Sequence, residues 1–133
     1  MFTAIDISTS GLVAQRTQMN TIASNLANLQ TTRRADGQPG PYLRHVALLS
    51  AGDGQGGDGV HVQRIVEDGN ILPRMVKDPG HPDADDDGYV LYPNVDLSTE
   101  MINAMVAVRA YEANVTAIEA AKSMIASTLR LLA

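Results

Sequence analysis

The chain has 133 residues, of which 44% are hydrophobic and 19% are charged, and its formal net charge is −5. These values are typical of one folded domain, so a disordered chain is not the default interpretation. The absence of cysteine excludes a disulfide framework and a thiolate metal site, and the acidic balance argues against binding of nucleic acid, which requires a basic stripe.

Residues 104–108 form the longest strictly apolar run. This run is far shorter than the roughly 20 residues that span a bilayer, so we expect no membrane insertion. The N-terminus has no basic region, and Asp6 interrupts what would be the apolar centre of a secretory signal. We therefore expect that any export uses a route without a cleaved signal peptide.

Residues 5–29 are predicted to form a helix with a narrow apolar stripe. The stripe consists of Ile5, Leu12, Met19 and Leu26 at heptad spacing, with Ile22 and Leu29 at the partner position. Gly11 weakens the first half, because glycine costs about 1 kcal/mol relative to alanine in a helix. We expect this helix to need a partner. Asn25 and Asn28 flank Leu26 and fix the register or anchor the following loop, or else form a polar outer face.

Residues 30–96 contain all six prolines and ten of the eleven glycines, so the chain turns repeatedly in this region. Four short segments have the composition of strands: residues 42–49, 60–66, 71–76 and 89–92. The Gly/Asp/Gln segment at residues 52–59 is typical of a flexible loop. The pattern predicts a small β-hairpin element.

Residues 97–132 are predicted to form a long helix, with Asp96 as its N-cap. One 4-3 pattern runs along it: Leu97, Met101, Ala104, Val108, Tyr111, Val115, Ile118, Lys122, Ile125, Leu129 and Leu132. Only Lys122 interrupts this stripe. The opposite face is also poor in charge, and a helix that is apolar nearly all round is usually buried on several sides. One partner helix would not cover it.

At 1.5 Å per residue, such a helix is roughly 54 Å long, whereas a compact chain of this size has a radius of gyration of about 14 Å. We therefore expect a mainly α fold: an elongated, coiled-coil-like hairpin of two long terminal helices with a small β-hairpin element between them. Three segments follow: residues 1–32 and 96–133 as assembly helices, and residues 33–95 as the connecting region with an acidic turn.

Chemistry-bearing motifs are sparse. Asp83, Asp85 and Asp87 match the first half of a calcium loop, but Asn94 stands where the bidentate glutamate should be, so a solvated acidic turn is the preferred interpretation. The three histidines have no ligand spacing. No nucleophile elbow or phosphate loop is present. We predict no catalytic residue, no metal site and no cofactor.

Three segments resemble bacterial flagellar axial proteins. Residues 23–28, followed by Thr31 and Thr32, are similar to the N-terminal signature of that family, and residues 109–115 are similar to its C-terminal helix. Residues 78–95 look like the proximal rod subgroup, FlgC type. The resemblance implies a structural subunit of the torque-transmitting basal-body rod, which crosses the periplasm and is exported by the flagellar type III apparatus without a cleaved signal.

The resemblance also implies the partners: other proximal and distal rod proteins, copies of the same chain and, indirectly, proteins at the junction of the membrane ring and export gate. We predict one assembly interface from the two helices: Ile5, Leu12, Met19, Ile22, Asn25, Leu26, Asn28, Leu29, Leu97, Met101, Val108, Tyr111, Asn114, Val115, Ile118, Ile125, Leu129 and Leu132. Two alternatives remain at this point, a helical adaptor or secretion chaperone and a calcium-binding module at Asp83, Asp85 and Asp87.

Overall fold

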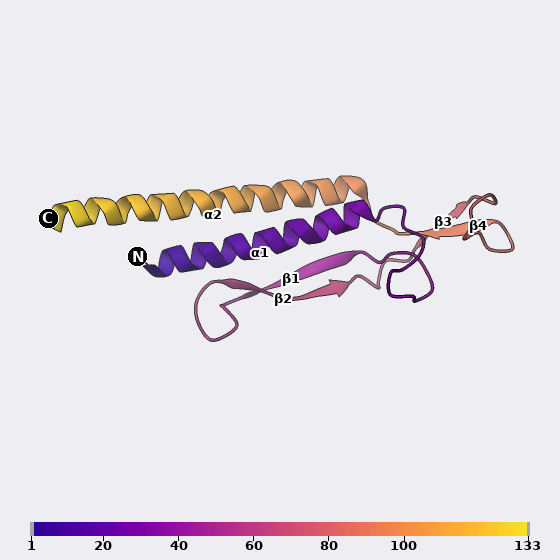
Figure 1. Cartoon of the computed structure of the whole chain (residues 1–133), viewed down its shortest axis with the longest axis horizontal. Helices are drawn as coiled ribbons and strands as arrows, with labels where there is room; N and C mark the ends of the chain where they lie inside the picture. Colours follow the sequence, from indigo (N-terminus) through magenta and orange to yellow (C-terminus); the bar gives the residue numbers. More distant parts are fainter. Residues whose placement is uncertain (1, 133) are drawn as a thin grey trace.

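The computed structural model describes residues 2–132. Two antiparallel helices, α1 (Phe2–Ala27) and α2 (Leu97–Leu132), lie side by side along the length of an elongated molecule (Figure 1). The region between them forms short antiparallel strands, so the expected mainly helical architecture is confirmed. Within the described residues, neither helix contains a stretch long and apolar enough to cross a membrane.

Local hydrogen bonds mark the end of α1 and the start of α2. α1 ends at Ala27, because the amides of Leu29 and Thr31 bond three residues back in tight turns. The prediction that the helix reaches Leu29 is therefore wrong by two residues. α2 begins at Leu97, and the Asp96 carboxylate caps it by accepting a 2.8 Å bond from the Thr99 amide. Hydrogen bonds from Thr99 lower the pKa of the Asp96 carboxyl, and the bond from the Thr99 hydroxyl has a larger effect than the bond from the Thr99 amide.

The first hairpin packs along α1. Strands β1 (His45–Ala51) and β2 (Val60–Glu67) pair antiparallel, with an irregularity between Leu48 and Leu49. The hairpin approaches the helix closely at its tip, where Gly59 has a φ of +121° and an added Cβ would lie 2.6 Å from Ser10 Oγ. Glycine is required there both for backbone conformation and for space. α1 thus lies between α2 and the β1–β2 hairpin (Figure 1).

A second hairpin lies at the end of the molecule where α1 ends and α2 begins (Figure 1). Strands β3 (Arg74–Lys77) and β4 (Tyr89–Tyr92) pair antiparallel and form a separate two-stranded sheet. The sequence predicts all four strand segments, but it predicts a single hairpin element where the structure has two. Strand composition marks the segments but does not determine which of them pair.

The apolar core is small and is made mainly of small side chains. Its fully buried apolar members are Ala14, Ile22, Val90, Ala107 and Ala121. Most of the large apolar residues of α2 are exposed instead. The monomer therefore leaves much of its apolar surface in contact with solvent.

Candidate assembly interface

Two heptad lines of α2 contact α1. The inner line consists of Glu100, Ala107, Asn114 and Ala121, all buried except Asn114, which lies against Gly11. The second line consists of the half-buried residues Ala104, Tyr111, Ile118 and Ile125. Together they form a narrow seam of the kind that two long helices make.

The predicted stripe shares only the second of these lines. Its other line consists of Met101, Val108, Val115, Lys122 and Leu129, of which all but the half-buried Val115 are exposed. The seam within the chain is therefore rotated by one residue relative to the predicted stripe. This rotation explains why a lysine is tolerated at position 122: the side chain that interrupts the predicted stripe lies outside the seam and faces solvent.

Small residues cause the rotation. A Cβ at Gly11 would lie 2.7 Å from Asn114 Nδ2, so a larger residue at this point of α1 would displace the Asn114 amide. The alanines of the inner line similarly let the two backbones approach. Close approach of helices favours small side chains at the contact. The residues of the inner line recur every seven positions, which is the sequence pattern that could have identified them. A search restricted to large apolar residues does not detect this pattern.

The predicted interface residues of the N-terminal segment all have restricted exposure. Ile22 and Asn25 are buried, and the remainder are half-buried: Ile5, Leu12, Met19, Leu26, Asn28 and Leu29. On α2, half-buried members are Tyr111, Asn114, Val115, Ile118 and Ile125, whereas Leu97, Met101, Val108, Leu129 and Leu132 are exposed. The structure thus divides the predicted set into residues that contact the chain itself and residues that remain uncovered.

Asn25 lies at the centre of an anchoring network formed with Tyr42, Arg44, His45 and Glu100. Its side chain is only 1% exposed. Its Nδ2 donates to the His45 carbonyl at 2.8 Å and to Glu100 Oε2 at 3.0 Å, and its Oδ1 accepts from the Tyr42 hydroxyl and the His45 amide. A primary amide can make two donated and two accepted bonds, and Asn25 makes all four. It joins α1 to β1 and to α2.

Glu100 is fully buried and is neutralised by Arg44. Arg44 Nε lies 2.7 Å and Nη2 2.6 Å from Glu100 Oε1, while Nη1 lies 3.8 Å from Asp68. A buried carboxylate is tolerated only when it is paired and hydrogen-bonded, which is the case here. The pairing of Glu100 with Arg44 spans 56 residues of chain, so no local sequence pattern indicates it.

Tyr42 and His45 complete the network on the side of β1. The Tyr42 hydroxyl lies 2.6 Å from His45 Nδ1, and the two rings contact each other. Burial raises the pKa of the Tyr42 hydroxyl, and the nearby Glu100 and Glu67 carboxylates raise it further. The hydroxyl therefore stays protonated and donates to Asn25.

The second predicted asparagine, Asn28, orders the chain just after α1. Its Oδ1 accepts from the Thr31 hydroxyl at 2.9 Å, and its Nδ2 donates to the Ser24 carbonyl at 2.8 Å. The next residues, Thr32 and Arg33, both bind the Asp83 carboxylate. This contact ties the loop after α1 to the turn between β3 and β4.

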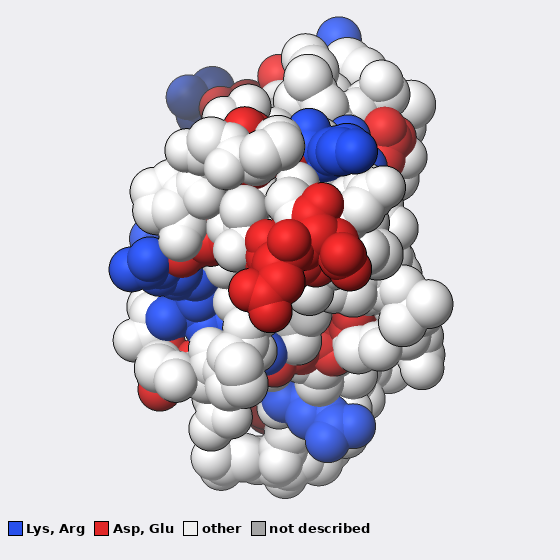
Figure 2. Space-filling model, turned by 90° about the vertical axis from the view of Figure 1, so that its right-hand side faces the viewer, with Lys and Arg blue, Asp and Glu red and all other residues white. Residues whose placement is uncertain are grey.

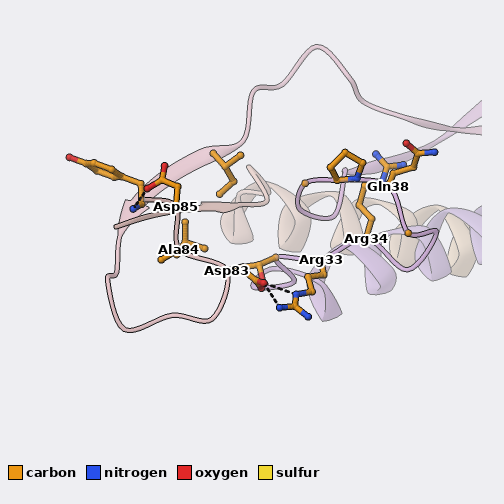
Figure 3. Close-up of a pocket in the computed structure, with 13 residues that line it drawn as sticks. Arg33, Arg34, Gln38, Asp83, Ala84 and Asp85 are labelled. Atoms are coloured by element: carbon orange, nitrogen blue, oxygen red, sulfur yellow. Dashed lines mark hydrogen bonds and ion pairs between the residues drawn. The ribbon is translucent and has the colours of Figure 1, made fainter. Parts of the chain in front are cut away.

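Figure 3 shows this tether beside a hollow of about 470 Å³ between the loop after α1 and the β3–β4 turn. Hydrogen bonds from the Arg33 guanidinium and, to a smaller extent, from the Thr32 hydroxyl lower the pKa of the Asp83 carboxyl. Asp85 Oδ1 accepts from the amides of Tyr89 and Asp87. The Asp83 and Asp85 carboxylates thus bind the protein itself, and within residues 2–132 no three ligand-type side chains are grouped to hold a metal ion.

The outer face of α2 is an uncovered apolar surface of the helical hairpin. We define it by five exposed residues of its first three turns: Leu97, Met101, Ile102, Met105 and Val106. Met105, at its centre, is 61% exposed. Large contiguous apolar surfaces on a monomer mark sites of interaction with other proteins.

Comparison with known proteins identifies the family. Residues 5–33 match the family model of the flagella basal body rod protein, and residues 86–131 match the C-terminal model of the FlgEFG rod proteins. The chain is 39% identical to the flagellar basal-body rod protein FlgC of Bacillus subtilis, over 98% of this chain and 97% of that protein. It is 42% identical to FlgC of Salmonella typhimurium, over 95% and 93%. The chain belongs to the FlgC family of flagellar basal-body rod proteins.

Proposed function

We propose that this protein is a structural subunit of the proximal part of the bacterial flagellar rod and has no enzymatic activity. The observation that carries the proposal is the uncovered outer face of α2, which a solitary monomer would expose to water. Burial of apolar area is worth about 25 cal/mol per Å², so neighbouring helices would be strongly favoured to cover it. The names of these relatives agree with this role.

Assembly would proceed by coiled-coil-like packing of the terminal helices. The inner line of α2 joins the two helices within one subunit, and the outer face joins neighbouring subunits, which are other rod proteins and copies of the chain. The predicted interface residues Leu97 and Met101 stay exposed on the outer face and belong to this second contact. A shaft that transmits torque requires helices held on several sides.

We place the assembled subunit in the part of the rod that crosses the periplasm. By resemblance to its family, the chain would reach this site through the flagellar export apparatus, without cleavage of a signal peptide. Mass spectrometry of the subunit from purified basal bodies tests this point. Detection of the N-terminal peptide with Asp6 supports it, and a processed N-terminus in the second or third turn of α1 contradicts it.

The two alternative functions have less support. A secretion chaperone would share the helical seam. The family match at residues 86–131 also includes residues 86–96, which lie before α2 and which a helical seam alone does not require. A calcium module at Asp83, Asp85 and Asp87 would need free carboxylates, and Asp83 and Asp85 bind the protein itself.

The proposed function is tested with a strain that lacks the gene. We expect this strain to lack hooks, filaments and swimming, and the wild-type gene to restore all three. A Met105→Glu gene should fail to restore them, although the purified variant keeps the wild-type helix content, because the charge lies on the outer face and not in the seam. Gln38→Glu, in an exposed loop, is the matched control and should restore swimming. A deletion strain that swims normally overturns the proposal.

A further inference from the structure

The β3–β4 hairpin receives little support from its own chain. Among residues 2–132, no helix and no other strand packs against β3 or β4. On one face of the hairpin Val90 is buried, and the His81 ring, from the turn that joins the strands, lies edge-on against Tyr92. An isolated two-stranded hairpin is marginally stable in water, so the second face also needs a cover.

That second face is apolar and uncovered. Met75 and Leu91 are cross-strand partners, 60% and 43% exposed, and Tyr89 follows on the same side, with Lys77 Nζ 5.8 Å from its ring centroid. Leu72, just before β3, is also exposed. We refer to Leu72, Met75, Tyr89 and Leu91 as the exposed hairpin face.

A second uncovered apolar segment lies at the opposite end of the molecule. The Asn25 amide bonds Glu100, and Gly11 lies against Asn114, so the helices keep one antiparallel register over fourteen residues of each. Continued to its start, this register places Phe2 opposite Ser123. Residues 124–132 of α2 therefore extend past α1 by about 13 Å at 1.5 Å per residue, and Figure 1 shows this helix overhang.

The overhang and the hairpin end are complementary in character. The overhang exposes Met124, Leu129, Leu131 and Leu132, and Leu131 is 88% exposed. Arg130 is the only charged side chain in residues 124–132. The hairpin end instead carries exposed acidic residues in the turn at residues 85–87, and Figure 2, which faces this end, shows a group of acidic side chains near its centre.

We propose that the exposed hairpin face binds the helix overhang of a second copy of this chain, so that subunits join end to end. The contact covers two apolar surfaces that the monomer leaves bare, and it brings Arg130 toward the acidic turn. Because the two surfaces lie at opposite ends of one elongated molecule, the contact is heterologous and extends along an axis instead of closing a dimer. The inference rests on the proposed function, since it specifies one contact within a rod.

Cysteine cross-linking tests this contact directly, because the natural chain has no cysteine. Full-length Met75→Cys, carrying an affinity tag, is mixed with untagged Leu129→Cys and oxidised mildly. A docked hairpin raises the effective concentration of the two thiols, so we expect about tenfold or more heterodimer relative to a matched mixture. That mixture pairs Leu129→Cys with tagged Gln63→Cys, an exposed position on β2.

A charge introduced at the contact provides the second arm. Adding Leu131→Asp to the Leu129→Cys chain should reduce the heterodimer to the level of the Gln63 mixture, while the helix content stays unchanged because Leu131 is 88% exposed in the monomer. Equal heterodimer from the Met75 and Gln63 mixtures overturns the inference, as does cross-linking that persists with Leu131→Asp. If either occurs while the deletion strain still requires the wild-type gene for hooks, the end-to-end contact is wrong and the rod function stands.

Discussion

Asn25 uses its whole hydrogen-bonding capacity inside the molecule. Two of its bonds go to the His45 backbone, one to Glu100 and one to Tyr42. Because the His45 amide can only donate and its carbonyl can only accept, the orientation of the Asn25 amide is determined by its partners. Neither aspartate nor glutamine reproduces this arrangement, since the first lacks a donor and the second is longer. A single residue thus holds two helices and one strand together.

We expect Asn25→Asp to lower the free energy of unfolding by about 3 kcal/mol or more, because it places a carboxylate beside the buried Glu100 carboxylate and the His45 carbonyl. Asn25→Ala should cost less, about 1–3 kcal/mol, since it leaves polar groups unpaired but adds no charge. Urea unfolding measures both.

Asn20→Asp is the matched control, because Asn20 is exposed on the same helix. It should change the unfolding free energy by about 0.5 kcal/mol or less. If Asn25→Asp is as stable as Asn20→Asp, the network does not anchor the helices.

At the scale of the elements, the sequence predicts more of the helices than of their contacts. The bounds of α2 follow from Asp96 and from a run without glycine or proline. The strand segments follow from composition, but their division into two hairpins does not. The seam was predicted on the largest apolar residues, whereas the contact with α1 forms through Ala107 and Ala121, whose size gives no hydrophobic signal. The Arg44–Glu100 pair is non-local, so no local pattern reports it.

The rotated seam leads to a prediction about neighbouring residues of α2. Ala107 is buried against α1 and Val106 is exposed. Ala107→Leu should therefore force the helices apart and cost about 1–3 kcal/mol of unfolding free energy. Val106→Leu, a comparable enlargement one residue earlier, should stay within about 0.5 kcal/mol.

Thermal unfolding of the purified monomers, followed by circular dichroism, compares the two variants. A seam on the predicted stripe would give a different result, with Val108→Ala destabilising and Ala107→Leu tolerated. That pattern would contradict the rotated register.

At the scale of the whole molecule, the chain keeps its stabilising contacts and its uncovered surfaces apart. The contacts lie between α1, the β1–β2 hairpin and one side of α2. The uncovered apolar residues lie on the outer face of α2, on the exposed hairpin face and on the helix overhang. A subunit built in this way can fold as a small elongated unit and still offer surfaces on its side and at both ends, which is the arrangement that a packed shaft requires.

This separation predicts the effect of removing the overhang. A chain that ends at Ser123 keeps Ala107, Asn114 and Ala121 of the inner line and loses only one half-buried seam residue, Ile125. Its unfolding free energy should fall by about 1 kcal/mol or less, because only one partly buried apolar side chain leaves the seam. A gene that encodes this truncated chain should nevertheless fail to restore hooks and swimming in the deletion strain, because the helix end that neighbours would bind is missing.

A chain that ends at Thr116 provides the matched comparison. It also loses Ile118 and the buried Ala121, so it should unfold with a free energy lower by about 2 kcal/mol or more. Urea unfolding and swimming assays on both truncations therefore separate folding from assembly. If the chain ending at Ser123 restores swimming, residues 124–132 have no part in the rod. If it unfolds as readily as the chain ending at Thr116, the overhang supports the monomer instead, and the α1–α2 register would have to place a contact beyond Ser123.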